Sequence, residues 1–281
     1  MRKLLLASAL FAALAGSASA YTAYVMPDDF LPADRSVSLS ASYATTFFTP
    51  GSPVGGTFVA IEPDGAEGYF SYVEVTAQAT QMRSPLHKEG TYRFSSGEQL
   101  GGVANMVGVD GGWRQLGAGE VPPEGAPTTT LQTVTVADVY VTLGAPNRTA
   151  VDRTIGRLAL RPVTHPNQVV VSQGFQVNAT FDGAPFANAA LVVYKAGEPE
   201  NDLDRFFTTD ANGNATITFD SPGEYILVAR HRANAPAGSA AQIQSFTTSL
   251  VFETHDALPP VVQLPREAED QPNRRRNRIR R

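Results

Sequence analysis

The sequence predicts an all-β fold made of two β-sandwich domains, the second of them immunoglobulin-like. Short runs rich in β-branched and aromatic residues are separated by turn signals at nearly regular spacing, and no segment keeps a helical period. In the clearest run, Phe175, Val177 and Ala179 alternate with polar residues, which is the pattern of a half-buried strand. The 24 glycines and 20 prolines suit a chain with many turns.

The second domain is expected to span residues 153–256 and to be of immunoglobulin-like or transthyretin-like type. Its predicted strands are residues 168–171, 175–181, 189–194, 205–209, 215–220, 224–230 and 244–253. Asp182-Gly183 and Pro222-Gly223 are among the turn signals between these strands, because Asp, Pro and Gly favour tight turns.

The first domain is expected to span residues 21–152 and to be a sandwich as well. Its predicted strands are residues 24–26, 37–43, 58–61, 70–79, 91–94 and 134–143. The glycine-rich residues 95–112 lack the Gly-Lys-Ser/Thr ending of a phosphate-binding loop. We therefore predict a flexible loop or hairpin there, followed by a long loop over the Pro/Gly/Thr-rich residues 117–130.

Residues 1–20 have the pattern of a cleaved export signal. A basic start precedes an apolar run over residues 4–14, and residues 18–20 form a small-residue cleavage site. The apolar run is shorter than the ~20 residues that a membrane-spanning helix needs. The sequence therefore predicts a periplasmic protein whose mature chain begins at Tyr21 and does not span the membrane.

The other end of the chain, residues 257–281, is predicted to be a disordered Pro/Arg-rich tail. We expect residues beyond Leu258 to pack on nothing. Seven arginines against three acidic residues give residues 266–281 a charge of +4. The tail is either simply solvated or holds the protein electrostatically at an anionic envelope surface.

The body between these two ends is strongly acidic. Of the net charge of −5, the export signal contributes +2 and the tail +4, which leaves −11 for residues 21–265. An acidic body repels nucleic acid and lacks the basic face that nucleic-acid binding needs. We therefore exclude a nucleic-acid partner.

Sequence motifs for catalysis are absent. The chain has no Gly-x-Ser-x-Gly and no His-Glu-x-x-His, and without cysteine it forms neither disulfides nor thiolate sites. We therefore predict a non-enzymatic protein without catalytic residues. Asp210, Asn212 and Asn214 are spaced like the start of a calcium loop, but the glycine and glutamate of that motif are misplaced, so a hairpin turn is predicted.

Three residues are candidate ligands for a divalent metal: His165, Asp182 and His231. With immunoglobulin-like strand order, alternate connections lie at one end of the sandwich, which would bring the three together. Imidazole and carboxylate both suit cations such as nickel or cobalt. The alternative is that His165 caps the turn before Pro166 while His231 lies in solvent.

Four segments with turn signals carry a family resemblance. They are residues 156–167 (GRLALRPVTHPN), 182–185 (DGAP), 209–213 (TDANG) and 222–225 (PGEY). In this order and spacing they resemble a bacterial periplasmic family of unknown function that is often associated with nickel and cobalt uptake. Many members begin the mature chain with a histidine and a nearby tryptophan, whereas this chain begins with Tyr21 and has neither in that stretch.

Two hypotheses for function follow. The resemblance implies an exported accessory or binding protein of the envelope that assists nickel or cobalt uptake, with an envelope transport component as its partner. The rival is a structural or adhesive β-sandwich module that binds a protein or glycan partner. Saturable metal binding would favour the first hypothesis, and no binding would favour the second.

Overall fold

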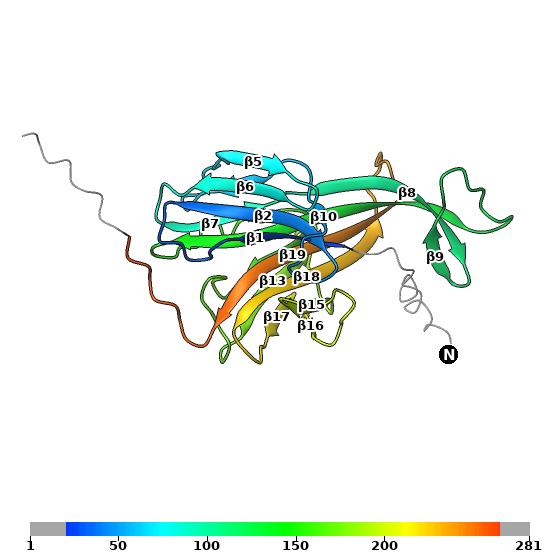
Figure 1. Ribbon diagram of the computed structural model, residues 1–281. Coiled ribbons are helices and arrows are strands. Elements are labelled where there is room, and N and C mark those ends of the chain that lie inside the picture. Colours follow the sequence, from blue (N-terminus) through cyan, green and yellow to red (C-terminus); the bar gives the residue numbers. More distant parts are fainter. Residues whose placement is uncertain (1–20, 265–281) are drawn as a thin grey trace, which may run out of the picture.

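The computed structural model describes residues 21–264. In this part of the chain the β-strands form three sheets, connected by turns and loops (Figure 1). The predicted export signal, residues 1–20, and most of the predicted tail, residues 265–281, lie outside this part of the chain. Within residues 21–264, no helix has the length and apolar character needed to cross a bilayer. The predicted all-β sandwich fold is confirmed.

The first sheet has five strands, ordered β1-β2-β6-β5, with β3 paired to β2. Its strands are β1 (Thr22–Pro27), β2 (Ser36–Ala44), β3 (Ser52–Pro53), β5 (Tyr72–Val75) and β6 (Thr80–Pro85). Along β2, Val37, Leu39 and Ala41 are buried and the serines between them are half-buried, as the alternation predicted. The single strand predicted over residues 70–79 is wrong, because a turn closed by the N–H of Thr76 donating to the carbonyl of Ala79 separates β5 from β6.

The middle sheet has ten strands, and its main path runs β16-β15-β18-β19-β10-β7-β4. Its strands are β4 (Val59–Ile61), β7 (Gly90–Ser95), β8 (Gln99–Val109), β9 (Gly112–Gln115), β10 (Thr128–Leu143), β12 (Val169–Val170), β15 (Ala190–Lys195), β16 (Phe206–Thr208), β18 (Gly223–Asn234) and β19 (Ile243–His255). The long strands β10 and β19 pair in parallel at its centre, with Leu131 opposite Ile243 and Val139 opposite Val251.

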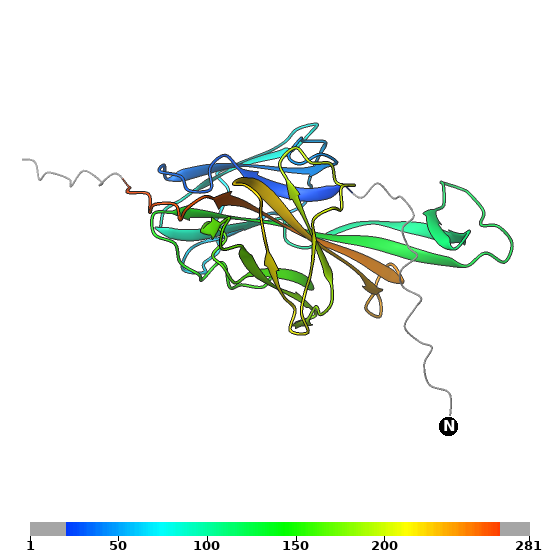
Figure 2. The same cartoon turned by 90° about the horizontal axis from the view of Figure 1, so that it is seen from below.

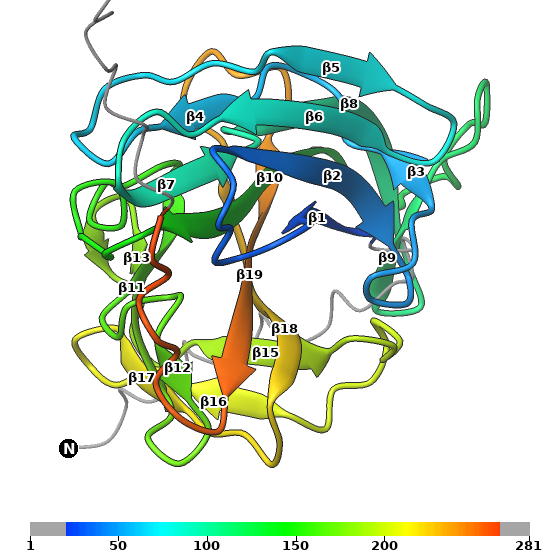
Figure 3. The same cartoon turned by 60° about the vertical axis from the view of Figure 1, so that its left-hand side comes forward.

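The third sheet has four strands, ordered β11-β13-β14, with β17 paired to β13. Its strands are β11 (Leu158–Pro162), β13 (Phe175–Phe181), β14 (Ala184–Pro185) and β17 (Asn214–Ile217). Figure 3 shows the first and third sheets on either side of the twisted middle sheet. The molecule is therefore a three-layer β structure.

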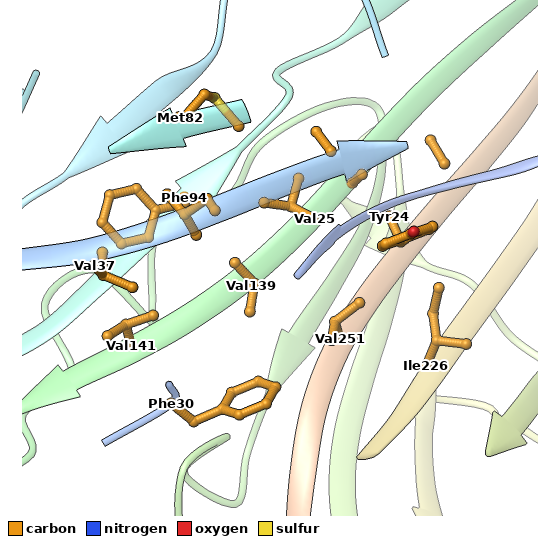
Figure 4. Close-up of a cluster of buried hydrophobic side chains, with 14 of the residues drawn as sticks. Tyr24, Val25, Phe30, Val37, Met82, Phe94, Val139, Val141, Ile226 and Val251 are labelled. Atoms are coloured by element: carbon orange, nitrogen blue, oxygen red, sulfur yellow. The ribbon is translucent and has the colours of Figure 1, made fainter. Parts of the chain in front are cut away.

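Two hydrophobic cores lie on opposite faces of the middle sheet. The first, against the first sheet, includes Phe94, Val139 and Ile226 (Figure 4). The second, against the third sheet, includes Phe175 and Leu227. Neighbouring residues of one strand point to opposite faces, so β18 supplies Ile226 to one core and Leu227 to the other.

The predicted domain boundary after residue 152 falls in the connection between β10 and β11. Strands from both sides of that boundary nevertheless pair in the middle sheet, through β10 and β19. Each core also contains residues from both predicted domains: Tyr194 lies in the first core and Val134 in the second. The two sandwiches therefore share one sheet, which local sequence patterns do not reveal because the paired strands lie more than 100 residues apart in the chain.

A buried ion pair lies on the second-core side of the middle sheet. The guanidinium of Arg93 donates two hydrogen bonds to the carboxylate of Asp138, at 3.2 and 2.5 Å, and both side chains are only 2% exposed. Arg93 also donates to the carbonyl of Arg153 and lies 5.5 Å from the ring of Tyr140. These contacts tie β7, β10 and the chain after β10 together.

Residues 100–131 form an arm that projects beyond the body (Figures 1 and 2). β8 pairs with the first half of β10, and β9 folds back on the end of β8. The β8–β9 hairpin turns at Asp110 and Gly111, both with positive φ, which is the conformation that a two-residue hairpin loop requires. None of the arm's residues belongs to either core.

The part of the tail that the structure describes is not without contacts. Leu264 packs against the first core. The expectation that nothing beyond Leu258 packs on the body is therefore wrong at Leu264, because an apolar side chain in a mostly polar segment still gains by covering the core. Figure 3 shows this segment, in red, running beside the body from the end of β19.

Candidate functional site

His165, the first candidate ligand, is buried and fully engaged. Its Nε2 lies 2.9 Å from Oγ1 of Thr91 and 3.1 Å from the carbonyl oxygen of Asn147, and its Nδ1 accepts from the N–H of Asn167 at 3.3 Å. A carbonyl only accepts, so Nε2 carries the proton. Burial lowers the pKa of His165. Because both ring nitrogens have partners, this histidine acts as a structural link between β7 and the turn before β12.

Asp182 and His231 lie together in a cluster at the other end of the third sheet. Asp182 and Gly183, both with positive φ, form the two-residue turn between β13 and β14, as the Asp-Gly signal predicts. Next to this turn, the ring of His231 meets the ring of Phe181 edge-on at 4.4 Å. The pKa of His231 is lowered by burial, and the nearby carboxylate of Asp182 opposes that effect.

Arg157 occupies the position that a cation would take beside Asp182. Its guanidinium donates from Nε and Nη2 to the two carboxylate oxygens of Asp182, at 2.6 and 2.7 Å. It also lies 5.0 Å from the ring centroids of both Phe181 and Phe246. These hydrogen bonds lower the pKa of Asp182. The carboxylate is thus already neutralised by a side chain of the same protein.

The structure does not bring His165 to this cluster. His165 lies beyond the end of β11 where Pro162 pairs with Val177, whereas Asp182 follows the opposite end, where Leu158 pairs with Phe181. Four residues separate these ends along β13, roughly 13 Å at the rise of a strand. Across residues 21–264, nowhere do three histidine or acidic side chains converge to hold a metal ion.

The calcium-like segment forms a hydrogen-bonded turn. One carboxylate oxygen of Asp210 accepts from the backbone N–H groups of Asn212 and Asn214, at 2.8 Å each. The other oxygen accepts from the side-chain amide of Asn214 at 3.3 Å. The carboxylate is used to close the turn before β17. The predicted turn is therefore present, but it is not a hairpin, because β16 pairs with β15 in the middle sheet and β17 pairs with β13 in the third sheet.

The most exposed apolar side chains on a long strand lie on the arm. Leu100 is 63% exposed and Val103 is 43% exposed, both on β8. On the side away from β10, β8 is paired with β9 only from Met106 onward. Residues 100–104 therefore form an open strand edge, and this edge carries no charged side chain. At Gly102 an added Cβ would meet nothing within 4 Å, so another backbone can approach closely.

A pocket of about 480 Å³ opens on the body, beside the beginning of β15. Its lining includes the apolar side chains of Ala189, Val192, Leu203 and Val228 and the charged side chain of Arg230. Volumes of this order are typical of sites for small ligands or for side chains of a partner.

Sequence patterns missed both of these surfaces. Gly101 and Gly102 conceal the alternation of β8, so the sequence predicts a flexible loop or a hairpin over residues 95–112 without an exposed edge. The hairpin is confirmed by the pairing of β8 with β9. The pocket is formed by residues from the β14–β15 turn, the loop before β16 and β18, which are separated in sequence.

Among curated proteins, none matches this chain. Two solved structures show a faint likeness. The D0-D1 domain of Intimin is 15% identical over 81% of this chain and 96% of its own, with a TM-score of 0.21. The D00-D0 domain of Intimin is 12% identical over 83% of this chain and 100% of its own, with a TM-score of 0.17. At these TM-scores neither likeness informs fold or function.

A family model matches residues 18–233, which is most of the chain. The expected resemblance to a family of unknown function is confirmed at this level, and the association with nickel and cobalt uptake stays a prediction. The chain belongs to the family described as a domain of unknown function, DUF4198.

Proposed function

We propose that this protein is an exported, non-enzymatic binding module of the cell envelope that engages a protein partner through its arm. The observation that carries the proposal is the open edge of β8 at residues 100–104, with Leu100 and Val103 exposed and no charge in the segment. Proteins usually protect such edges with charged side chains or with covering elements. An edge left open in this way suits the addition of an extended strand from a partner.

The position of the two cores supports this proposal. Both cores lie in the body, and the arm contributes to neither. The arm therefore exposes backbone and apolar side chains without a packing role that would explain them. A partner strand paired along residues 100–104 would gain hydrogen bonds from the backbone and apolar contact from Leu100 and Val103.

The proposal does not extend to metal uptake. His165 uses both ring nitrogens, and Asp182 is held by Arg157, so the candidate ligands have other partners. Export with cleavage before Tyr21 is part of the proposal. Mass spectrometry of the exported product should find Tyr21 as its first residue, and a product that retains Met1 would contradict this part.

Photo-crosslinking in the native cell envelope tests the binding proposal. A photoreactive residue at Asn105, exposed at the end of the open edge, should give one discrete protein adduct. The same photoreactive residue placed at position 74, in place of the exposed Glu74 on β5, should not give that adduct. The arm variant Leu100→Lys/Val103→Lys should lose the adduct, because charges on an edge oppose strand addition.

A matched control separates the arm from exposed edges in general. Val73 and Val75 are 54% and 65% exposed on β5, the edge strand of the first sheet. The control variant Val73→Lys/Val75→Lys adds the same charges there and should keep the adduct at Asn105. Loss of the adduct in both variants, or in neither, would contradict the proposal.

A further inference from the structure

The pocket beside β15 has an apolar lining, and one of its lining residues, Leu203, comes from an acidic segment of the chain. Val192, Val228 and Leu203 line this hollow, and Leu203 remains 57% exposed. Asp202 and Asp204 flank Leu203 in the sequence. An exposed leucine beside a hollow that its own chain leaves open indicates a place for another apolar side chain.

The charges around this pocket do not cancel. Residues 198–205, the segment that brings Leu203 to the pocket and is called the rim here, contain four acidic side chains and one arginine. Arg230 of the pocket lining adds one positive charge, so together they carry −2. Arg205 pairs with Glu198, and Arg230 pairs with Glu200 at 2.5 Å. Within residues 21–264, Asp202 and Asp204 form no ion pair. The pocket therefore suits an apolar side chain that is flanked by cationic ones.

The chain's own C-terminal end has this composition. Residues 274–281 read RRRNRIRR, in which Ile279 is the one apolar side chain and has arginines on both sides. Leu264, where the described chain ends, packs against the first core, and Val192 packs against the same core. Fifteen residues separate Leu264 from Ile279, and an extended chain of that length spans up to roughly 50 Å. A body of this size has a radius of gyration of roughly 18 Å, so Ile279 can reach the pocket.

We propose that residues 274–281 dock at this pocket, with Ile279 in the apolar hollow and the flanking arginines on Asp202 and Asp204. Tethering favours this contact, because the covalent connection through residues 265–273 keeps the segment at a high effective concentration near the pocket. The tail then occupies a site of the body, and the acidic body and basic tail are complementary parts of one chain. This contact is separate from the open edge of the arm.

Disulfide trapping in the full mature chain tests the contact, since the chain has no cysteine of its own. Ala187 is exposed and lines the pocket, and Asn277 lies two residues before Ile279. A protein with Ala187→Cys and Asn277→Cys should form an intramolecular disulfide under mild oxidation. Adding Asp202→Asn/Asp204→Asn should slow its formation at least about tenfold, because the rim charges that hold the arginines are gone.

A second pair of substitutions controls for overall charge. Glu67→Gln/Glu124→Gln removes the same two charges from exposed side chains outside the pocket and should leave the trapping rate unchanged. Replacing Ile279 by Ser should slow trapping without changing any charge. Equal rates in the protein with and without the rim substitutions would overturn the proposal. An equal slowing by the rim pair and by the control pair would overturn it as well, because the tail would then respond only to net charge.

Discussion

The two halves of β10 differ in burial: the second half is buried and the first half is not. From Val136 to Leu143 the strand lies between two sheets, and most of its side chains are buried. From Thr128 to Leu131 it lies in the arm and is exposed or half-buried. One continuous strand thus belongs to the body at one end and to the arm at the other. One strand can therefore run from a body whose cores bury it into an arm that neither core reaches.

The largest effect should come from breaking the ion pair in the buried half of β10. The variant Asp138→Ala leaves the Arg93 guanidinium without its carboxylate at a site that is 2% exposed. We expect the free energy of unfolding to fall by about 3–5 kcal/mol, because an unpaired charge is then buried. Urea unfolding followed by circular dichroism measures this loss.

An exposed pair provides the matched control. Asp152 pairs with Arg148 at 2.8 Å, and both side chains are exposed. Asp152→Ala should cost less than about 1 kcal/mol, since water screens this pair. Equal costs for the two variants would mean that burial does not set the importance of the Arg93–Asp138 pair.

A smaller effect should appear in the pH dependence of stability. The folded pKa of His165 is lowered by burial, so between that pKa and about 6.5 the unfolded chain binds a proton that the folded chain does not. The contribution of neutral His165 to the free energy of unfolding is then fully present above about pH 6.5. It is lost as the pH falls through the folded pKa. His165→Gln should show a shallower fall over the same range. Part of the fall should remain, because the pKa of His231 is lowered too.

This pH prediction is checked by urea unfolding of both proteins at a series of pH values from neutral to mildly acidic. Glutamine at position 165 keeps a side-chain N–H that can donate to the carbonyl of Asn147, which limits structural damage. Parallel stability curves for the two proteins across this range would contradict the role given to His165.

Shortening the arm should have a small effect on stability. Val107 pairs with Thr128 at the end of the β8–β10 ladder, so Asn-Gly in place of residues 108–127 would close a two-residue hairpin there. These residues belong to neither core, and we expect the free energy of unfolding to change by less than about 1 kcal/mol. A loss of several kcal/mol in urea unfolding would show that the arm supports the body.

Local patterns predicted the strands well and their partners poorly. The predicted strand over residues 175–181 coincides with β13 (Phe175–Phe181), because period-two alternation follows directly from one buried face. The parallel pairing of β10 with β19 joins segments that are distant in sequence, and alternation does not encode which strands meet. We predicted two separate sandwich domains in sequence order, whereas the structure shows two sandwiches that share the middle sheet.

The candidate site shows the same limit. Asp182 and His231 lie in one cluster, as the predicted strand positions suggested, while His165 lies at the opposite end of β13. Sequence alone did not show that Arg157 would take the place beside Asp182, because that contact depends on the pairing of β11 with β13. The open edge of β8 was hidden by Gly101 and Gly102, which lack side chains to mark an alternation.

The most direct test of the account compares stability and partner engagement in the arm variant Leu100→Lys/Val103→Lys. Both positions are exposed and lie outside the two cores, so the free energy of unfolding should stay within about 0.5 kcal/mol of the parent protein. The photo-crosslinked adduct at Asn105 should be lost in the same variant. An adduct that persists, or that disappears only together with a large loss of stability, would contradict the separation of a stable body from a binding arm.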